Sequence, residues 1–532
     1  MYDADHDARG ITRRDALKGT LALSFAAMSG GALAACGGGG TASAPTTAAG
    51  KPRRGGTLTV AISNSSKSET LDPATPTVSS EYVLLGLVYD SLTRLSNDDW
   101  KLSPGLAESW EPNADLTQWT LKLRPGVTFH DGRPLTADDV VWSLRRVLDP
   151  DVGSSAYDRA KRTMTPAGIT AKGNDVVRVQ LRRPDSMLPV LLARPHFSII
   201  PAGVDSFSVK TAMGTGPFKL KSWQAGRSWE VVRNPDYWEH GRPYLDGVRE
   251  VVTAESAVRV QGVLTGEFQL AEEIDFASAR SQQKSDPASL LTLPKGVNRV
   301  IVMDCSVEPF TDPRVVQAFK LAIDRPVSVN AVFQGFGVEG ADITVPPKDR
   351  FFPTGLKPPA YDPERAKGLL AEAGHPNGID IDLLTSQVFS NMPEMAVTFS
   401  QSAQSAGIRA NVRQQAPDSY WDKVWRSKPF YTTYWATEYP PDNLWRIYSG
   451  PLNEAHLKIP EFSTLFDQIL RTGDEQKQVS LTQEAHQIAA ERWGHIIPTV
   501  VESVWCTTPK LRGVQGDPPA FRVRLGDAYL ES

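Results

Sequence analysis

The chain has 532 residues, of which 40% are hydrophobic and 22% are charged, as is ordinary for a soluble globular protein. A formal net charge of −4, without a basic block after Arg53 and Arg54, argues against nucleic acid as a partner. The length exceeds what one hydrophobic core usually serves, so we expect two or three lobes.

The first 35 residues predict a removable signal peptide. Thr12 to Asp15 contains two arginines and resembles a twin-arginine export signal, although Ala16 stands where a bulky apolar residue is usual. The segment from Gly19 to Ala35 is short and only weakly hydrophobic, which disfavours a membrane-spanning helix. Because small residues precede Cys36, as in a lipoprotein cleavage box, we expect the mature protein to begin at Cys36. Acyl chains on that sulfur would hold it on the periplasmic or cell-surface face of a membrane.

Residues 36–54 predict a flexible Gly/Ala/Thr tether, and strands then alternate with helices along the rest of the chain. The predicted strands are Thr57–Ile62, Trp119–Leu123, Val176–Leu181, Phe218–Trp223, Glu230–Arg233 and Val300–Met303. The predicted helices are Ser79–Leu92, a helix that begins after Thr136, Pro313–Asp324, Pro363–Glu372 and Glu394–Ala406. Thr136 is the expected N-cap, because Asp138 and Asp139 follow it in the first turn. This alternation favours an α/β protein.

Four sequence blocks lie in order along most of the chain after the leader. They are Gly105–Trp110 with Leu123–Val140, Gly214–Phe218 with Arg233–Trp238, Pro309–Ala318 with Ala322–Arg325, and Tyr361–Ala366 with Leu370–Gly374. Together these blocks resemble the bacterial extracellular solute-binding proteins of family 5, which are the peptide, dipeptide and nickel receptors of ATP-binding-cassette (ABC) importers.

The resemblance implies an α/β fold of the type II periplasmic-binding-protein kind, with three lobes, a hinge and a ligand cleft between lobes. Lobe I would be discontinuous and would combine residues 55–90, 205–304 and 499–532. Lobe II would span residues 91–204, and lobe III residues 305–498. Two strands, near Val300–Asp304 and Val500–Trp505, would cross between lobes I and III.

A segment from Tyr420 to Tyr448 contains ten aromatic residues and is the candidate ligand-binding region. Within it, Trp435 to Tyr439 resembles the peptide-receptor motif in which an aspartate takes the ammonium of the bound peptide. Glu438 stands at that position here, and Tyr434, Trp435 and Tyr439 are its expected neighbours at the ligand. A buried amine needs such a charged partner. The alternatives are a solvated or internally ion-paired Glu438, and aromatic residues that serve the core.

Other candidate residues have two possible roles each. Asp304 could face the cleft or could bond the hinge. Ser80 and Glu81 could offer polar groups to the ligand or could cap the helix that begins there. Cys305 and Cys506 could form a disulfide in an oxidising compartment, and the implied neighbouring crossovers favour this, but two buried free thiols remain the alternative.

The chain carries no sequence motif of a hydrolase, metalloprotease or nucleotide-binding enzyme. The eight histidines lack metal-ligand spacing. We therefore expect a monomeric solute receptor without cofactor, metal or catalytic residues, whose partners are a peptide or other amine-bearing ligand and the permease of an ABC importer. The same fold could instead bind an opine, an oligosaccharide, haem or a nickel chelate. A secreted hydrolase and a receptor without transport function are more distant alternatives.

Overall fold

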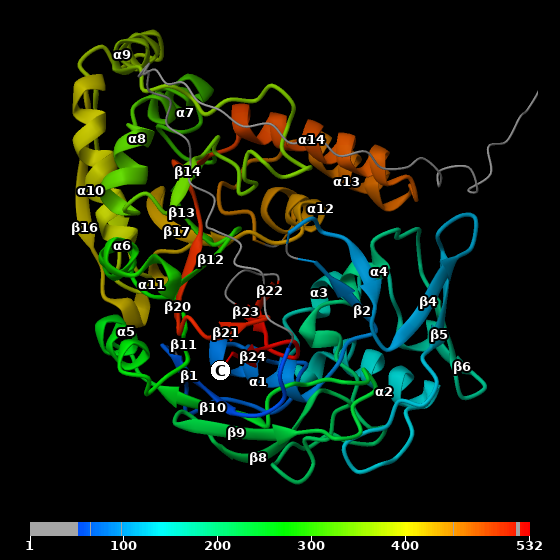
Figure 1. The fold of residues 1–532 in the computed structure, drawn as a ribbon. Coiled ribbons are helices and arrows are strands. Elements are labelled where there is room, and N and C mark those ends of the chain that lie inside the picture. Colours follow the sequence, from blue (N-terminus) through cyan, green and yellow to red (C-terminus); the bar gives the residue numbers. More distant parts are fainter. Residues whose placement is uncertain (1–51, 64, 97, 451, 518–521, 532) are drawn as a thin grey trace, which may run out of the picture. The chain divides into compact units, whose positions relative to one another are not determined.

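The computed structural model describes residues 52–63, 65–96, 98–450, 452–517 and 522–531 (Figure 1). The expected signal peptide and residues 36–51 of the expected tether lie outside this range. Residues from Gly50 to Ser532 form one unit by their contacts. Within the described residues, no helix is both long and apolar enough to cross a membrane.

A seven-stranded mixed sheet contains strands from three distant parts of the chain. Its order is β12-β20-β11-β1-β10-β9-β8, with β1 parallel to both of its neighbours. The strands are β1 (Thr57–Ile62), β8 (Phe218–Gln224), β9 (Ser228–Arg233), β10 (Gly247–Val252), β11 (Leu270–Ala271), β12 (Leu290–Leu293) and β20 (Ser503–Thr507). Strand β1 is buried on both faces after Thr57, as is typical of a central strand between parallel neighbours.

A four-stranded antiparallel sheet is formed within one continuous stretch of chain. Its order is β4-β5-β7-β6, and its strands are β4 (Ala107–Pro112), β5 (Gln118–Leu123), β6 (Ile169–Lys172) and β7 (Val176–Gln180). Helix α2 (Ala137–Val147) packs against this sheet with its apolar face. Thr136 caps α2 as predicted, since its backbone N–H and its hydroxyl both donate to Asp139, at 2.9 and 2.8 Å.

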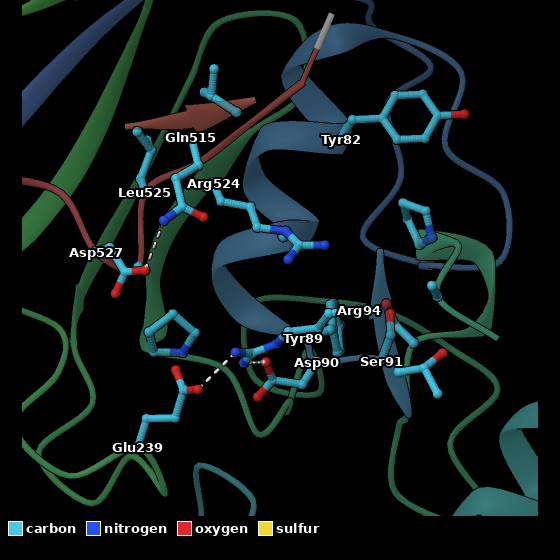
Figure 2. A pocket seen from close by; sticks show the side chains of 18 of the residues that line it. Tyr82, Tyr89, Asp90, Ser91, Arg94, Glu239, Gln515, Arg524, Leu525 and Asp527 are labelled. Atoms are coloured by element: carbon cyan, nitrogen blue, oxygen red, sulfur yellow. Dashed lines mark hydrogen bonds and ion pairs between the residues drawn. The ribbon is translucent and has the colours of Figure 1, made fainter. Parts of the chain in front are cut away.

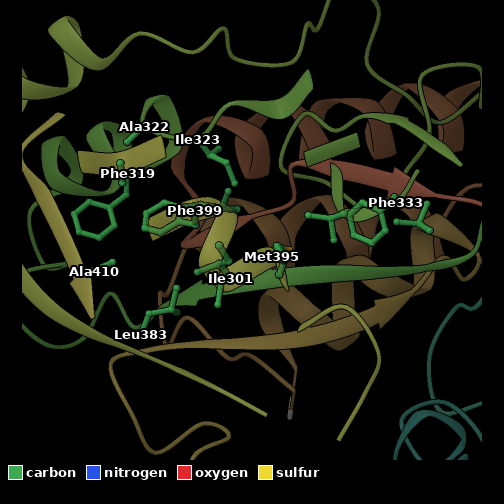
Figure 3. Packing of buried hydrophobic residues seen from close by; sticks show 14 of the residues in the cluster. Ile301, Phe319, Ala322, Ile323, Phe333, Leu383, Met395, Phe399 and Ala410 are labelled. Carbon is green, nitrogen blue, oxygen red and sulfur yellow. The ribbon is translucent and has the colours of Figure 1, made fainter. Parts of the chain in front are cut away.

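A five-stranded sheet has the order β16-β15-β17-β13-β18. Its strands are β13 (Val297–Met303), β15 (Ile379–Thr385), β16 (Ile408–Gln414), β17 (Phe430–Ala436) and β18 (His495–Ile496). Every residue of β13 is buried, because the strand lies between β17 and β18 in the sheet. Figure 3 shows part of the core on one face of this sheet, where Ile301 of β13 and Leu383 of β15 lie near Phe319 and Phe399 of two covering helices.

The remaining elements are helices and short two-stranded sheets. The longer helices are α1 (Ser79–Val88), α5 (Ser256–Leu264), α6 (Phe276–Ser285), α7 (Pro313–Leu321), α9 (Pro363–Glu372), α10 (Met392–Ala403), α13 (Pro460–Leu470) and α14 (Glu475–Arg492). The short helices are α3 (Tyr157–Ala160), α4 (Leu188–Leu191), α8 (Arg325–Val327), α11 (Tyr420–Lys423) and α12 (Pro440–Asn443), with π-helical turns at Ser328–Val332 and Leu444–Ser449. The short sheets pair β2 (Thr93–Leu95) with β3 (Leu102–Pro104), β14 (Gly337–Glu339) with β19 (Thr499–Val501), β21 (Leu511–Arg512) with β24 (Tyr529–Leu530), and β22 (Gln515–Asp517) with β23 (Arg522–Arg524).

The chain enters or leaves the seven-stranded sheet at two adjacent points. At residues 294–296 it passes from β12 to β13 of the five-stranded sheet, and at Glu502 it passes from β19, the partner of β14, to β20. The Gly296 N–H donates to the Val501 carbonyl at 2.8 Å, and a Cβ on Gly296 would lie 2.8 Å from backbone atoms of residues 501–503. Only glycine therefore fits this close approach of two chain segments without a shift of the backbone.

Two strands pair outside the expected grouping of chain segments. Strand β19, which the expected bounds assigned to lobe I, pairs with β14, which they assigned to lobe III. Strand β13 belongs wholly to the five-stranded sheet, whereas the expected boundary at residue 304 assigned it to lobe I. The chain leaves the first sheet before Val297, because β13 forms its ladder hydrogen bonds with β17 and β18. The division into three lobes itself stays a prediction.

Candidate ligand-binding site

The ten aromatic residues of the segment from Tyr420 to Tyr448 divide into two groups. Six are buried in the core, namely Tyr420, Phe430, Tyr431, Trp435, Tyr439 and Tyr448. Four keep access to solvent, namely Trp421, Trp425, Tyr434 and Trp445. The core role that the sequence left open therefore applies to most of them.

An aromatic row, defined as Phe389, Tyr434, Trp421 and Trp425, lies partly exposed near the end of β17. Phe389 and Tyr434 stack with centroids 4.4 Å apart, and Trp421 meets Tyr434 edge-on at 5.6 Å and Trp425 at 6.1 Å. The guanidinium of Arg299 lies 4.5 Å from the Phe389 ring. Stacked rings of this kind present a stiff apolar surface with polar tips, which suits ligand contact.

Glu438 is held by two arginines. It follows β17 and precedes α12, and its Oε2 accepts from Arg194 Nη2 at 2.9 Å and forms an ion pair with Arg446 Nη1. Burial raises the pKa of Glu438, but the charges of Arg446 and Arg194 outweigh this effect and lower the pKa to about 2. Glu438 is thus an internally ion-paired carboxylate that keeps 16% side-chain exposure.

The ion pairs continue inward from Arg194. Its Nη2 also contacts Asp442 at 3.2 Å, Asp442 accepts from Arg159 Nε at 3.0 Å, and Arg159 Nη1 donates to Asp185 at 3.0 Å. Arg159, Asp185 and Asp442 are almost fully inaccessible to solvent. With Arg446 and Glu438 this ion-pair network has three positive and three negative groups, so its formal charges balance.

Trp435 and Tyr439 flank Glu438 in sequence but belong to the core. Trp435 Nε1 donates to Glu454 Oε2 at 2.7 Å, and Tyr439 packs edge-on against Trp100 and Phe351. Arg446 lies 5.8 Å from the Trp435 ring. Of the expected neighbours of Glu438, only Tyr434 is exposed, and it belongs to the aromatic row.

Ser80 and Glu81 are buried at the start of α1. Glu81 accepts from the backbone N–H groups of Thr70, Thr77 and Val78, at 2.6, 2.6 and 2.9 Å. The Ser80 hydroxyl accepts from Trp229 Nε1 at 3.3 Å. Glu81 thus fixes the loop before α1 to the helix, which is the capping role among the two alternatives, whereas Ser80 joins α1 to Trp229 of β9.

Asp304 directly follows β13 and is also buried. It accepts from the Ser306 N–H and hydroxyl, at 2.9 and 2.6 Å, and lies 2.8 Å from His456 Nδ1. These bonds join the end of β13 to the loop that contains His456, so Asp304 organises the backbone here.

A separate polar cavity of about 120 Å³ lies beside α1 and the β23 strand (Figure 2). Arg94 pairs with Asp90 at 3.2 Å and with Glu239 at 2.7 Å. Figure 2 shows these three side chains together with Arg524, which also lines the cavity. Its lining contains none of the residues that the sequence predicted for ligand contact. In the described part of the chain, no group of His, Cys, Asp or Glu side chains could hold a metal ion.

The family model of bacterial extracellular solute-binding proteins, family 5 Middle, matches residues 101–452. The chain belongs to this family. Among curated proteins, the glutathione-binding protein GsiB of Shigella dysenteriae serotype 1 (strain Sd197) is 29% identical over 469 residues, covering 84% of this chain and 89% of GsiB. GsiB of Escherichia coli (strain K12) is 28% identical with the same coverage.

Two solved structures show that this solute-binding protein has the type II periplasmic-binding-protein fold. The ABC transporter-associated periplasmic binding protein DppA from Helicobacter pylori, in complex with peptide STSA, gives a TM-score of 0.75 at 24% identity. AgaA from A. tumefaciens R10, in complex with agropinic acid, gives 0.74 at 24% identity. Each comparison covers 90% of this chain and 99% of the other.

The expected crossovers do not bring the two cysteines of this solute-binding protein together, and both are free thiols in the structure. From the adjacent points at Gly296 and Glu502, β13 runs into the five-stranded sheet and β20 into the seven-stranded sheet. Cys305 lies beyond the far end of β13, whereas Cys506 lies in β20. Because the two strands diverge, the disulfide that the sequence left open is not formed.

Sequence reasoning missed three charged residues around the candidate site. Arg446 lies eight positions after Glu438, and its location in an aromatic segment was the available signal. Arg194 is 244 positions away from Glu438, so no local pattern joined them. Glu454 is fully buried behind Trp425 and Trp435. No local sequence pattern around Glu454 indicated that this charged residue would be buried.

Proposed function

We propose that this protein is the exported receptor of an ABC importer, which captures a peptide or another small amine-bearing solute by hinge closure and delivers it to a membrane permease. The three expected lobes would move relative to one another, with the strand changes at Gly296 and Glu502 as the hinge. Lobe I would combine residues 55–90, 205–304 and 499–532, lobe II would span 91–204, and lobe III would span 305–498. The family match and the glutathione-binding relatives support this proposal.

The observation that supports an amine-bearing ligand is the ionisation of Glu438. It is a carboxylate with its pKa lowered to about 2, partly open to solvent, three residues after Trp435. It is therefore ionised at neutral pH. An ammonium group that leaves water can be compensated by such a fixed negative charge.

The test is the substitution Glu438→Gln, which keeps the shape of the side chain and removes its charge. We expect the affinity for short peptides, measured by calorimetry with the purified mature protein, to fall by roughly tenfold to a hundredfold, because a hydrogen bond between charged groups contributes about 1.5–3 kcal/mol.

The matched control is Glu461→Gln, since Glu461 forms an exposed ion pair with Arg492 at 3.0 Å. Its peptide affinity should equal that of the wild type. If the Glu438→Gln protein binds peptides as tightly as the wild type, Glu438 does not recognise the amine. If the wild type binds no peptide but binds a sugar or a metal chelate saturably, the ligand is not a peptide.

An opine is the second candidate ligand. It is favoured by the solved neighbour AgaA, which holds agropinic acid, and by the two guanidinium groups beside Glu438. An opine that binds through its carboxylates should lose less affinity than a peptide in the Glu438→Gln protein, so the same calorimetric titration separates the two classes.

The proposal also includes an acylated Cys36, a monomeric state, no cofactor and no chemical change of the ligand. The ligand should be recovered intact after prolonged incubation with the protein.

A further inference from the structure

The two arginines beside Glu438 keep unused hydrogen-bond donors. Arg194 contacts both Glu438 and Asp442 through Nη2 alone, and its Nε and Nη1 form no hydrogen bond with any residue that the structure describes. Arg446 contacts Glu438 through Nη1, and its Nε and Nη2 are likewise without a partner among the described residues. The side chains of Arg194 and Arg446 are 22% and 23% exposed, so solvent reaches both.

Glu438 keeps an unused acceptor in the same place. Both arginines contact its Oε2, and Oε1 accepts no hydrogen bond from any described residue. One side chain therefore offers an open carboxylate oxygen next to two guanidinium groups with open N–H donors. These are complementary partners for an ammonium group and for a carboxylate, respectively.

The buried part of the ion-pair network holds the guanidinium group of Arg194 in place. Asp442 and Asp185 lie in the interior with Arg159, whereas Arg194 and Arg446 reach the solvent. Glu438 and Asp442 together hold the Arg194 guanidinium through its Nη2. A fixed guanidinium loses less conformational entropy when it binds a carboxylate.

We propose that this site binds an amine and a carboxylate that the ligand carries on the same carbon, as in the head group of an α-amino acid. This inference rests on the proposed function. The open oxygen and the guanidinium groups belong to two ion pairs that share Glu438, so the two ligand groups must be adjacent. The ammonium would bind Glu438 Oε1, and the carboxylate would bind Arg194 and Arg446. The ordinary N-terminus of a peptide has the amine but carries a neutral amide carbonyl in place of the carboxylate.

Free amino acids carry this head group, and so do peptides whose first residue is linked through its side-chain carboxyl group, such as a γ-linked glutamate. The decisive probes are the isomers γ-Glu-Cys-Gly and α-Glu-Cys-Gly, kept reduced, with free glutamate as a third. The two isomers have the same composition and charge, and they differ in whether the amine-bearing carbon also bears a carboxylate. Calorimetric titration of the purified mature protein with each gives three dissociation constants.

We expect γ-Glu-Cys-Gly to bind at least about tenfold more tightly than α-Glu-Cys-Gly, since the second isomer leaves the guanidinium donors without a charged partner. Tighter binding of free glutamate than of γ-Glu-Cys-Gly would identify a free amino acid as the source of the head group. Arg194→Gln should reduce the preference between the isomers to less than about threefold, and Arg446→Gln provides the same test if Arg194→Gln fails to fold. Arg413→Gln, which affects an exposed ion pair with Asp382, should keep the full preference.

Equal or tighter binding of α-Glu-Cys-Gly would overturn this inference and leave the proposed peptide receptor standing. An equal loss of affinity for both isomers in Arg194→Gln and Arg446→Gln would also overturn it, because it would show a structural role only. If none of the three probes binds, the inference fails, and the peptide titration described above decides the proposed function separately.

Discussion

Glu454 is a buried carboxyl group behind the candidate site. Its oxygens accept from Trp435 Nε1 at 2.7 Å and from Trp425 Nε1, and His495 Nε2 lies 3.5 Å from Oε2 without forming a hydrogen bond. Burial raises the pKa of Glu454 to about 7, although hydrogen bonds from Trp435, Trp425 and Thr433 and the charge of Arg426 act in the opposite direction. Burial lowers the pKa of His495 to about 3, so this imidazole is neutral and cannot compensate the carboxylate. Glu454 thus changes charge near neutral pH.

The substitution Glu454→Gln should remove a pH-dependent destabilisation. The folded protein binds the Glu454 proton up to about pH 7, whereas the unfolded chain releases it near the ordinary value of 4.5. The folded state therefore binds more protons in this window, and its stability falls as the pH rises through it. We expect the difference in unfolding free energy between wild type and Glu454→Gln to change by about 3 kcal/mol from about pH 4 to about pH 8, in favour of the variant. Urea unfolding at several pH values measures this, and a constant difference would refute it.

At the scale of elements, ion pairs and hydrogen bonds connect the stretch 91–204 to the stretch 305–498. Arg159 of α3 pairs with Asp442 of α12, and Trp100 Nε1 donates to Asp349 Oδ2 at 2.6 Å. Such buried pairs gain little net free energy over apolar packing, but the loss of one partner leaves an uncompensated charge. They therefore fix which segments lie together more than they add to stability.

Asp442→Asn should destabilise the protein by about 3 kcal/mol, because Asp442 is the buried carboxylate between Arg159 and Arg194. Asp185 and Glu438 still pair with these arginines in the variant, which keeps the loss at the lower end for a broken buried pair. Urea unfolding followed by tryptophan fluorescence measures the effect.

Asp382→Asn is the matched control, since its ion pair with Arg413 at 3.3 Å is more than half exposed. It should unfold like the wild type. If Asp442→Asn also unfolds like the wild type, the buried pairs do not hold the two stretches together.

At the scale of the whole molecule, local patterns predicted the elements well and distant contacts poorly. The helix Pro363–Glu372 has the predicted bounds, because Asp362 caps it and accepts from the Arg365 N–H. The α/β class followed from such elements in order, and the family from blocks of adjacent residues. The pairing of Glu438 with Arg194 could not be predicted, because the two residues meet only through the tertiary fold. The same limit applies to β13, whose sheet is decided by β17 and β18 and not by its own residues.

The proposed anchor determines where the whole receptor works. Acyl chains on Cys36 contribute about 0.8 kcal/mol for each methylene that enters the bilayer, and two or more chains hold a protein stably. Cys36→Ser removes the acylated sulfur, so we expect the variant to move from the membrane fraction to the soluble fraction of the producing cells. Cys305→Ser is the matched control, since Cys305 is a partly buried free thiol within the fold, and this variant should stay with the membrane. Intact mass spectrometry of the wild type should give a chain that begins at Cys36 and carries acyl groups. A mature chain with an unmodified first cysteine, or a Cys36→Ser protein that stays in the membrane fraction, would contradict the anchor.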